Sequence, residues 1–119
     1  MNVEKLVSAV LDDLLVRTVV MSDNSGRGNV AFVVVDAYGI TTTHVREIRA
    51  SLADFCAAND IVSLNISVLH QHSAVDTLGM NGSILKALGN AGKADPVNGI
   101  NKAYMANMTA KIAETLESV

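Results

Sequence analysis

Apolar residues recur at helical spacing in three parts of the chain, and each part predicts an amphipathic helix. The first helix is expected over residues 3–13. The second is expected over 42–58, with Thr43 as a suitable N-cap. The third is expected over 101–118. Its apolar stripe predicts the core residues Met105, Met108, Ile112 and Leu116.

Shorter runs of β-branched residues predict three strands between these helices. Residues 14–21 and 30–35 flank a turn-forming cluster at 22–29, SDNSGRGN, which predicts a β-hairpin. The run VAFVVV at 30–35 is continuously apolar, which is typical of a strand buried on both faces. Residues 62–69 alternate between apolar and polar positions and follow the helix at 42–58. This order predicts a βαβ unit with 30–35 and 62–69 parallel.

The fold class expected is therefore α/β, with a β-hairpin plus a βαβ unit giving a small mixed sheet and helices packed on it. The length of 119 residues suits one domain, 1–119. Glycines and the single Pro96 punctuate the stretch from 70 to 100, which predicts loops, with a short helix at 83–88.

The composition is unusually apolar for a small domain. Hydrophobic residues make up 50% of the chain, charged residues only 18%, and the mean hydropathy is +0.32. Two explanations follow: the chain buries a face against another copy as a homo-oligomer, or it is part of a larger domain. Both are favoured over a self-sufficient monomer.

Charge and targeting signals exclude several classes of function. The formal net charge is −3 and no basic run occurs, which excludes a nucleic-acid-binding protein. No apolar run approaches the ~20 residues that span a bilayer. Acidic residues at Glu4, Asp12 and Asp13 are atypical of a secretory signal, and the single Cys56 leaves the redox compartment open. The localisation therefore stays unknown.

Two of the three histidines lie one residue apart at the end of the last strand, in SVLHQHSAVD. If the strand continues through them, His70 and His72 share one face, and both imidazoles reach the same point. Ligands of parallel sheets bind beyond the carboxyl ends of the strands, and neutral imidazole is a common zinc ligand. The alternative is a pair of solvated surface histidines. His44 is a possible third ligand, although a surface position suits it better.

Other polar residues add less to this site. Asp36 follows the strand 30–35 and is a candidate acceptor that orients an imidazole; the alternative is a turn or a helix cap. The Ser25–Gly28 segment resembles a phosphate loop but lies in a hairpin turn and opens no helix, so a structural role is favoured. Tyr104 is expected in the core.

The order of strand, His-x-His-Ser, loop and helix resembles the N-terminal part of the neutral/alkaline non-lysosomal ceramidases, whose signature is His-Thr-His-Ser-Gly-Pro. The stretch VRTVVMSDNSGRGNVAFVVVDAYGI resembles the hairpin of that family, and NKAYMANMTAKIAETLE resembles the helix after its histidine loop. The resemblance covers residues 13–118 in the same order. Gln71 and Ala74-Val75 depart from the signature, and the glycine-rich stretch 79–99 has no counterpart.

This resemblance implies a zinc-dependent amidohydrolase that cleaves the N-acyl amide bond of ceramide or a related lipid. It implies that His70 is a zinc ligand and that His72 lies beside the metal-bound water and assists proton transfer. Ser73 matches the serine of the signature without an assigned role.

The family's remaining zinc ligands, a second His, a Glu and a Tyr, come far downstream of the signature, so an N-terminal fragment of a longer hydrolase is expected. Whether the chain is itself an enzyme stays open. One alternative is a stand-alone α/β binding or assembly module with incidental histidines. Another is an oligomer that completes a metal site across a symmetry axis.

Overall fold

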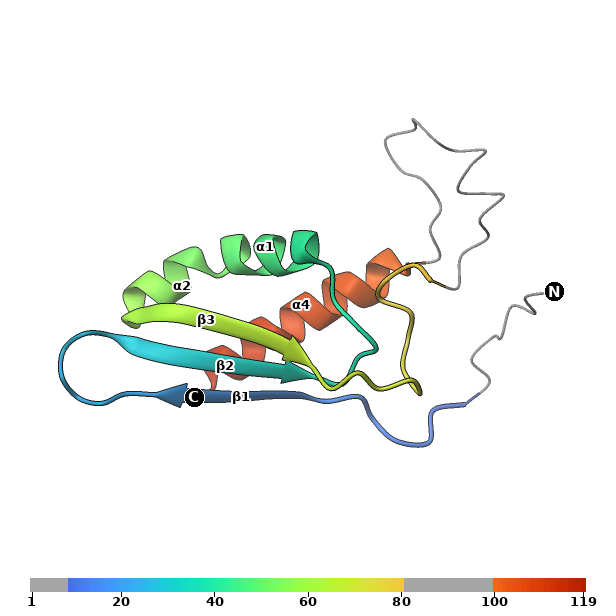
Figure 1. Ribbon diagram of the computed structural model, residues 1–119, viewed down its shortest axis with the longest axis horizontal. Coiled ribbons are helices and arrows are strands. Elements are labelled where there is room, and N and C mark those ends of the chain that lie inside the picture. The colour runs from blue at the N-terminus through green and yellow to red at the C-terminus, as the bar shows by residue number, and fades with distance from the viewer. Residues whose placement is uncertain (1–8, 81–99) are drawn as a thin grey trace, which may run out of the picture.

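Helices line one face of a three-stranded sheet in the computed structural model, which describes residues 9–80 and 100–119 (Figure 1). In this part of the chain, no helix is long and apolar enough to cross a membrane. The strands are β1 (Val16–Met21), β2 (Asn29–Val35) and β3 (Ile61–Val68), and the helices are α1 (Thr42–Ser51), α2 (Ala53–Ala58) and α4 (Lys102–Glu117).

The sheet has the predicted mixed topology. β2 lies in the centre, antiparallel to β1 and parallel to β3. Val35 at the end of β2 is the partner of Val16 on one side and of Val68 on the other. The beginning of β1 and the carboxyl ends of β2 and β3 therefore lie at the same end of the sheet. The hairpin turn lies at the opposite end (Figure 1).

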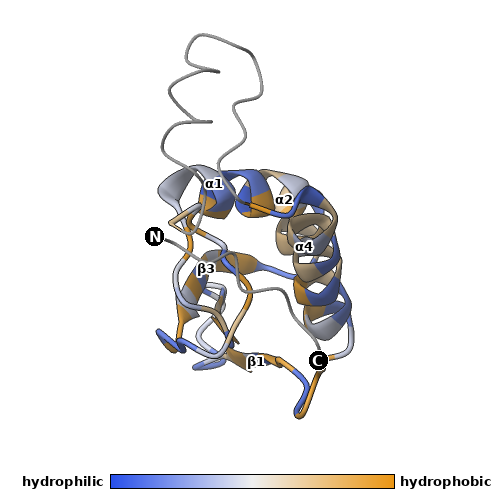
Figure 2. Ribbon diagram, turned by 90° about the vertical axis from the view of Figure 1, so that its right-hand side faces the viewer, coloured by the Kyte–Doolittle hydropathy of each residue, from blue (hydrophilic) through white to orange (hydrophobic). Residues whose placement is uncertain are grey.

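One face of the sheet forms the core together with the helices. α4 packs against β1 and α2 packs against β3, and all the helices lie on the same side of the sheet (Figure 2). A hydrogen bond of 2.9 Å between the hydroxyls of Thr18 and Thr115 joins β1 to α4. The predicted stripe of α4 is buried, and the core consists of Ala31, Val33, Val35, Ala37, Ile48, Leu52, Leu64, Met105, Met108, Ile112 and Leu116.

The expectation that the strand VAFVVV is buried on both faces is wrong. Ala31, Val33 and Val35 face the helices, but the alternate residues point to the other face, where Phe32 is 44% exposed. The reason is that the helices of the described residues all lie on one side, so only one face receives cover. Val19 and Met21 of β1 share the uncovered face with Phe32 and are 56% and 58% exposed.

The helix expected over 42–58 is interrupted. α1 ends at Ser51, and α2 begins at Ala53 after Leu52, whose φ of −106° and ψ of 7° are not helical. The Ser51 hydroxyl donates to the Ile48 carbonyl, which competes with the helical hydrogen bonds at this turn. The helix begins at Thr42, as expected, but its N-cap is Thr41 and not Thr43.

The N-terminal expectation also needs correction. Residues 9–13 are not helical, and the rest of the helix expected over 3–13 lies outside the described residues. β1 begins at Val16, but Leu15 already bonds to Asp36, since the Asp36 N–H donates to the Leu15 carbonyl at 2.9 Å. The short helix expected over 83–88 lies outside the described residues as well.

Candidate functional site

The His-x-His segment lies in a loop that follows β3, not in the strand. β3 ends at Val68, and His70 has a left-handed φ of 59°. The loop nevertheless stays attached to the segment after β2, because the Leu69 N–H donates to the Val35 carbonyl at 3.2 Å and the Gln71 N–H donates to the Ala37 carbonyl at 3.0 Å. The premise that a regular strand places both histidines on one face is therefore wrong.

The two imidazoles still come together, around the ring of Tyr38, which was not among the expected site residues. The ring centroids of His70 and His72 are 5.0 Å apart, and their planes are nearly perpendicular. The ring of Tyr38 lies 4.7 Å from that of His70 and 4.6 Å from that of His72. We call these three side chains the aromatic cluster. It lies beyond the carboxyl ends of β2 and β3, where parallel sheets bind ligands.

A hydrogen bond to the backbone fixes the orientation of His70. Its Nδ1 lies 2.9 Å from the carbonyl oxygen of Tyr38. A carbonyl oxygen only accepts, so Nδ1 carries the proton of this bond. In the neutral ring, Nε2 is then the nitrogen with a free lone pair. Donation of one ring N–H to a backbone carbonyl is also the usual arrangement of a metal-binding histidine.

The loop that carries the cluster is anchored to the segment after β2. Thr77 is fully buried, and its hydroxyl donates to the Gly39 carbonyl. Leu78 packs so closely on Gly39 that an added Cβ would lie 2.5 Å from its Cδ1 atom, which accounts for glycine at this position. The Asp76 carboxylate accepts from the N–H groups of Leu78 and Gly79 at 3.0 and 2.8 Å and shapes the turn.

A hollow of about 240 Å³ adjoins the aromatic cluster, and polar and apolar groups both line it. Its lining residues are Tyr38, His72, Ala74, Asp76 and Met80. The volume suits a small ligand or a group of a larger one. Ser73 is exposed in the same loop, and its carbonyl accepts from the Gln71 amide at 3.4 Å.

Asp36 connects two strands and is not bonded to an imidazole in this structure. Its carboxylate accepts from the Leu15 N–H at 3.0 Å and from the Arg17 guanidinium at 2.8 Å. These hydrogen bonds, led by the backbone one, hold the pKa of Asp36 below its ordinary value although burial opposes them. Asp36 thus takes neither of its expected roles, as an imidazole acceptor or as a turn or cap.

His44 lies apart from the cluster, in the first turn of α1. Its backbone N–H donates to the Thr41 hydroxyl, and its Nδ1 lies 2.8 Å from the same oxygen. It lines a different hollow of about 280 Å³, with Glu47 and residues at the start of α4. The partly buried Tyr104 packs against the core as expected, and desolvation raises its pKa.

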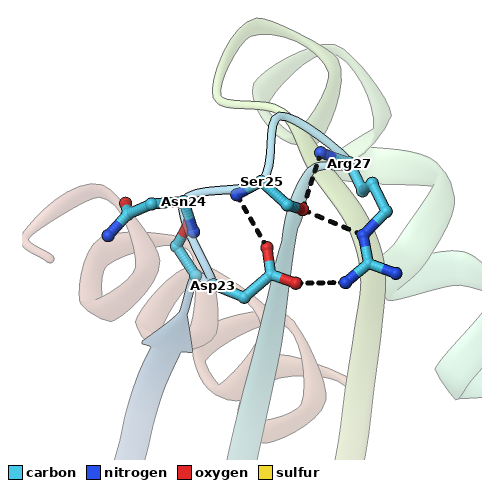
Figure 3. Close-up of polar contacts among 5 residues, drawn as sticks. Asp23, Asn24, Ser25 and Arg27 are labelled. Atoms are coloured by element: carbon cyan, nitrogen blue, oxygen red, sulfur yellow. Dashed lines mark hydrogen bonds and ion pairs between the residues drawn. The ribbon is translucent and has the colours of Figure 1, made fainter.

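The phosphate-like segment of the hairpin turn is bonded to itself (Figure 3). The Ser25 N–H donates to the Asp23 carboxylate at 2.9 Å, and the Ser25 hydroxyl accepts from the Arg27 side chain at 2.9 Å. Arg27 also pairs with Asp23. The Arg27 guanidinium is thus already paired with the Asp23 carboxylate of the same turn. This pairing supports a structural role for the turn over phosphate binding.

The aromatic cluster offers fewer donors than a metal site uses. Among residues 9–80 and 100–119, no group of three or more His, Cys, Asp or Glu side chains is arranged to hold a metal ion. His70 and His72 supply two nitrogen donors, whereas zinc sites use three or four protein ligands. A complete site would therefore need donors from outside the described residues.

Tyr38 could not be found from local sequence. It is separated from His70 by 32 positions, and only the parallel register of β2 and β3 brings the two residues together. The available signal was its place just after a buried strand, at the expected ligand-binding edge. No protein-family model, no curated protein and no solved structure matches this chain. The relationship to ceramidases therefore stays a hypothesis based on the quoted motifs.

Proposed function

We propose that the aromatic cluster is a partial zinc site and that the chain carries part of a zinc-dependent amidohydrolase. The substrate class would be an N-acyl lipid, ceramide or a relative of it. One observation supports the metal above all: the Nδ1–H of His70 is held by the Tyr38 carbonyl, which directs the Nε2 lone pair away from the backbone. The amidohydrolase part of the proposal rests on the sequence resemblance.

The position of the cluster agrees with this proposal. The imidazoles of His70 and His72 are neighbours, and the adjoining hollow offers space beside His72. A zinc ion bound by such a site supplies a water of lowered pKa and polarises the scissile carbonyl. His70 would hold the ion, and His72 would move a proton at the edge of the hollow. Tyr38 would fix both rings by packing against them.

Zinc titration calorimetry on the purified chain tests the metal site. We expect weak binding, because only two nitrogen donors lie together in the described part of the chain. Loss of an outer contact to a metal ligand already costs about 10–100-fold in affinity, so His70→Ala should lower the zinc affinity by roughly tenfold or more. His72→Ala should lower it less if His72 carries protons and does not bind the ion.

His44→Ala is the matched control, because it removes the third imidazole of the chain from a different hollow. Zinc binding should survive this change. Binding that survives His70→Ala, or that depends on His44, would place the metal elsewhere and contradict the proposal. We expect no hydrolysis of ceramide by the 119-residue chain, because a catalytic zinc needs more ligands than this cluster offers. Turnover by the purified chain would overturn the view of a partial site.

A further inference from the structure

The outer edge of β1 carries unpaired backbone groups in the described structure. Leu15 bonds to Asp36 across the hairpin, and hydrogen-bonded pairs alternate along an antiparallel ladder. The N–H and C=O groups of Arg17, Val19 and Met21 therefore point toward β2. Those of the intervening residues point away from the sheet: Val16, Thr18 and Val20.

The other edge of the sheet is protected, and this contrast identifies β1 as the open edge. The Leu69 N–H bonds to Val35 of β2, so alternation places the Leu64 carbonyl on the free side of β3. The Arg49 side chain from α1 donates to this carbonyl at 2.9 Å. A register shift at the start of β3 disturbs that edge further. Bulges and charged side chains are the usual protection of edge strands.

β1 has no bulge, because its register with β2 is regular. Its sequence VRTVVM contains no proline and one charged residue, Arg17, which is already paired with Asp36. Val19 and Met21 are more than half exposed on the uncovered face, next to Phe32 of β2. A regular apolar edge of this kind pairs readily with another strand.

We propose that β1 pairs antiparallel with β1 of a second copy, which joins two three-stranded sheets into one continuous sheet. A second copy fits because an antiparallel pair of identical strands is self-complementary about a two-fold axis. With Thr18 on the axis, Val16 pairs with the partner's Val20, and all the outward backbone groups of β1 find partners. The apolar stripes of the two outer faces also become continuous.

Charge selects this register over its neighbour. In the register centred on Thr18, Arg17 lies opposite the partner's Val19 on the outer face. A shift that centres the pair on Arg17 would place two guanidinium groups directly opposite each other, which is unfavourable. The register centred on Thr18 therefore avoids like-charge contact, and it is the one in which all three outward-facing residues of β1 pair within the strand, because a register centred on Val19 would place Val16 opposite Ser22 beyond its end.

Sedimentation equilibrium with Val→Lys variants on the two edges tests this interface. We expect a dimer of the wild-type chain at micromolar concentration. Val19→Lys places an ammonium group opposite the partner's Arg17 twice per dimer, so the dissociation constant should rise roughly tenfold or more. Val62→Lys is the matched control on β3, at the other edge of the sheet, where the Val62 side chain is 67% exposed, and it should leave the dimer intact.

A proline variant tests the backbone pairing separately from charge. The Val20 N–H points outward, so Val20→Pro removes a donor of the dimer without removing one from the β1–β2 ladder. It should yield a folded monomer, as judged by circular dichroism. A monomeric wild-type chain would overturn the proposal. A dimer that persists in Val19→Lys would also overturn it, and so would a dimer that Val62→Lys weakens as much as Val19→Lys does.

Amide exchange followed by NMR locates the interface without mutation. The amides of Arg17, Val19 and Met21 are protected by β2 in monomer and dimer alike and serve as internal references. The amides of Val16, Thr18 and Val20 should be protected only in the dimer, with protection that falls on dilution. Rapid exchange of these three amides in the dimer would overturn the proposal, because it would place the contact on another surface.

Discussion

Among single residues, Asp36 shows how a functional interpretation and a structural one diverge. A carboxylate at the carboxyl end of a parallel strand suggests a ligand or an acceptor for an imidazole. In the structure its oxygens accept from Leu15 and Arg17, so the side chain attaches the start of β1 to the end of β2. The sequence did not reveal this role, because both partners lie about twenty positions away across the hairpin.

Replacement of Asp36 by Asn should destabilise the chain by about 1 to 2 kcal/mol at neutral pH, since hydrogen bonds to a charged group are the stronger ones. The pKa of Asp36 is lowered in the folded chain, so its ionised form stabilises the fold above the ordinary value of 3.8. That contribution is lost as the pH falls through the folded pKa. Denaturant melts of both proteins should therefore differ at neutral pH and converge below pH 3.8.

Asp23→Asn is the matched control for this prediction. Its pKa is also lowered, by bonds to Ser25 and Arg27, but the carboxylate is solvated in the hairpin turn. Solvent screens such contacts, so this change should alter the stability less than Asp36→Asn does. A difference between wild type and Asp36→Asn that stays constant with pH would show that the charge of Asp36 does not stabilise the fold.

For whole elements, the sequence predicted most of the architecture. The strands are runs rich in β-branched residues and the long helix α4 has a helical period, and each is bounded by turn residues or a cap, so their positions and the mixed topology are confirmed. The break at Leu52 was missed because a buried leucine continues the apolar pattern of 42–58 while its backbone leaves the helix. The apolar period of a sequence indicates which side chains are buried, but it does not indicate the backbone torsion angles of those residues.

At the start of α1, Thr43 was the expected N-cap, but Thr41 takes this place in the structure. The run Thr41-Thr42-Thr43 offers three hydroxyls, and only Thr41 accepts from a backbone N–H of the first turn, that of His44. Thr41→Ala should therefore destabilise the chain by about 1 kcal/mol. Thr43→Ala is the matched control and should be nearly neutral, because Thr43 is exposed within the helix. Equal losses in thermal melts would show that the helix begins elsewhere.

The proximity of His70 and His72 was predicted from sequence, but the predicted reason for it differs from the one in the structure. The two histidines are close in sequence and stay close in space, but a left-handed residue at His70 brings them together, not a strand. Positive φ at a histidine cannot be read from sequence, since few non-glycine residues adopt it. Tyr38 joins the two histidines only because β2 and β3 pair in parallel, and this pairing is a long-range feature of the fold.

In the molecule as a whole, the proposed zinc site and the proposed dimer contact lie on different parts of the sheet. The aromatic cluster follows the carboxyl ends of β2 and β3, next to the start of β1, where Val16 pairs with Val35. An antiparallel β1 pair places the start of one strand beside the end of the other. The two clusters of a dimer would therefore lie at opposite ends of the joined sheet and would not complete a common metal site.

This separation predicts that zinc binding and dimerisation are independent. The monomeric Val19→Lys variant should bind zinc with the affinity and stoichiometry of the wild type, because it retains both imidazoles and the Tyr38 carbonyl contact. His70→Ala should in turn remain a dimer, because the change lies outside β1. Titration calorimetry and sedimentation of both variants measure the two properties. Loss of zinc binding in the monomer would instead indicate a site completed by two chains, since linked equilibria affect each other reciprocally.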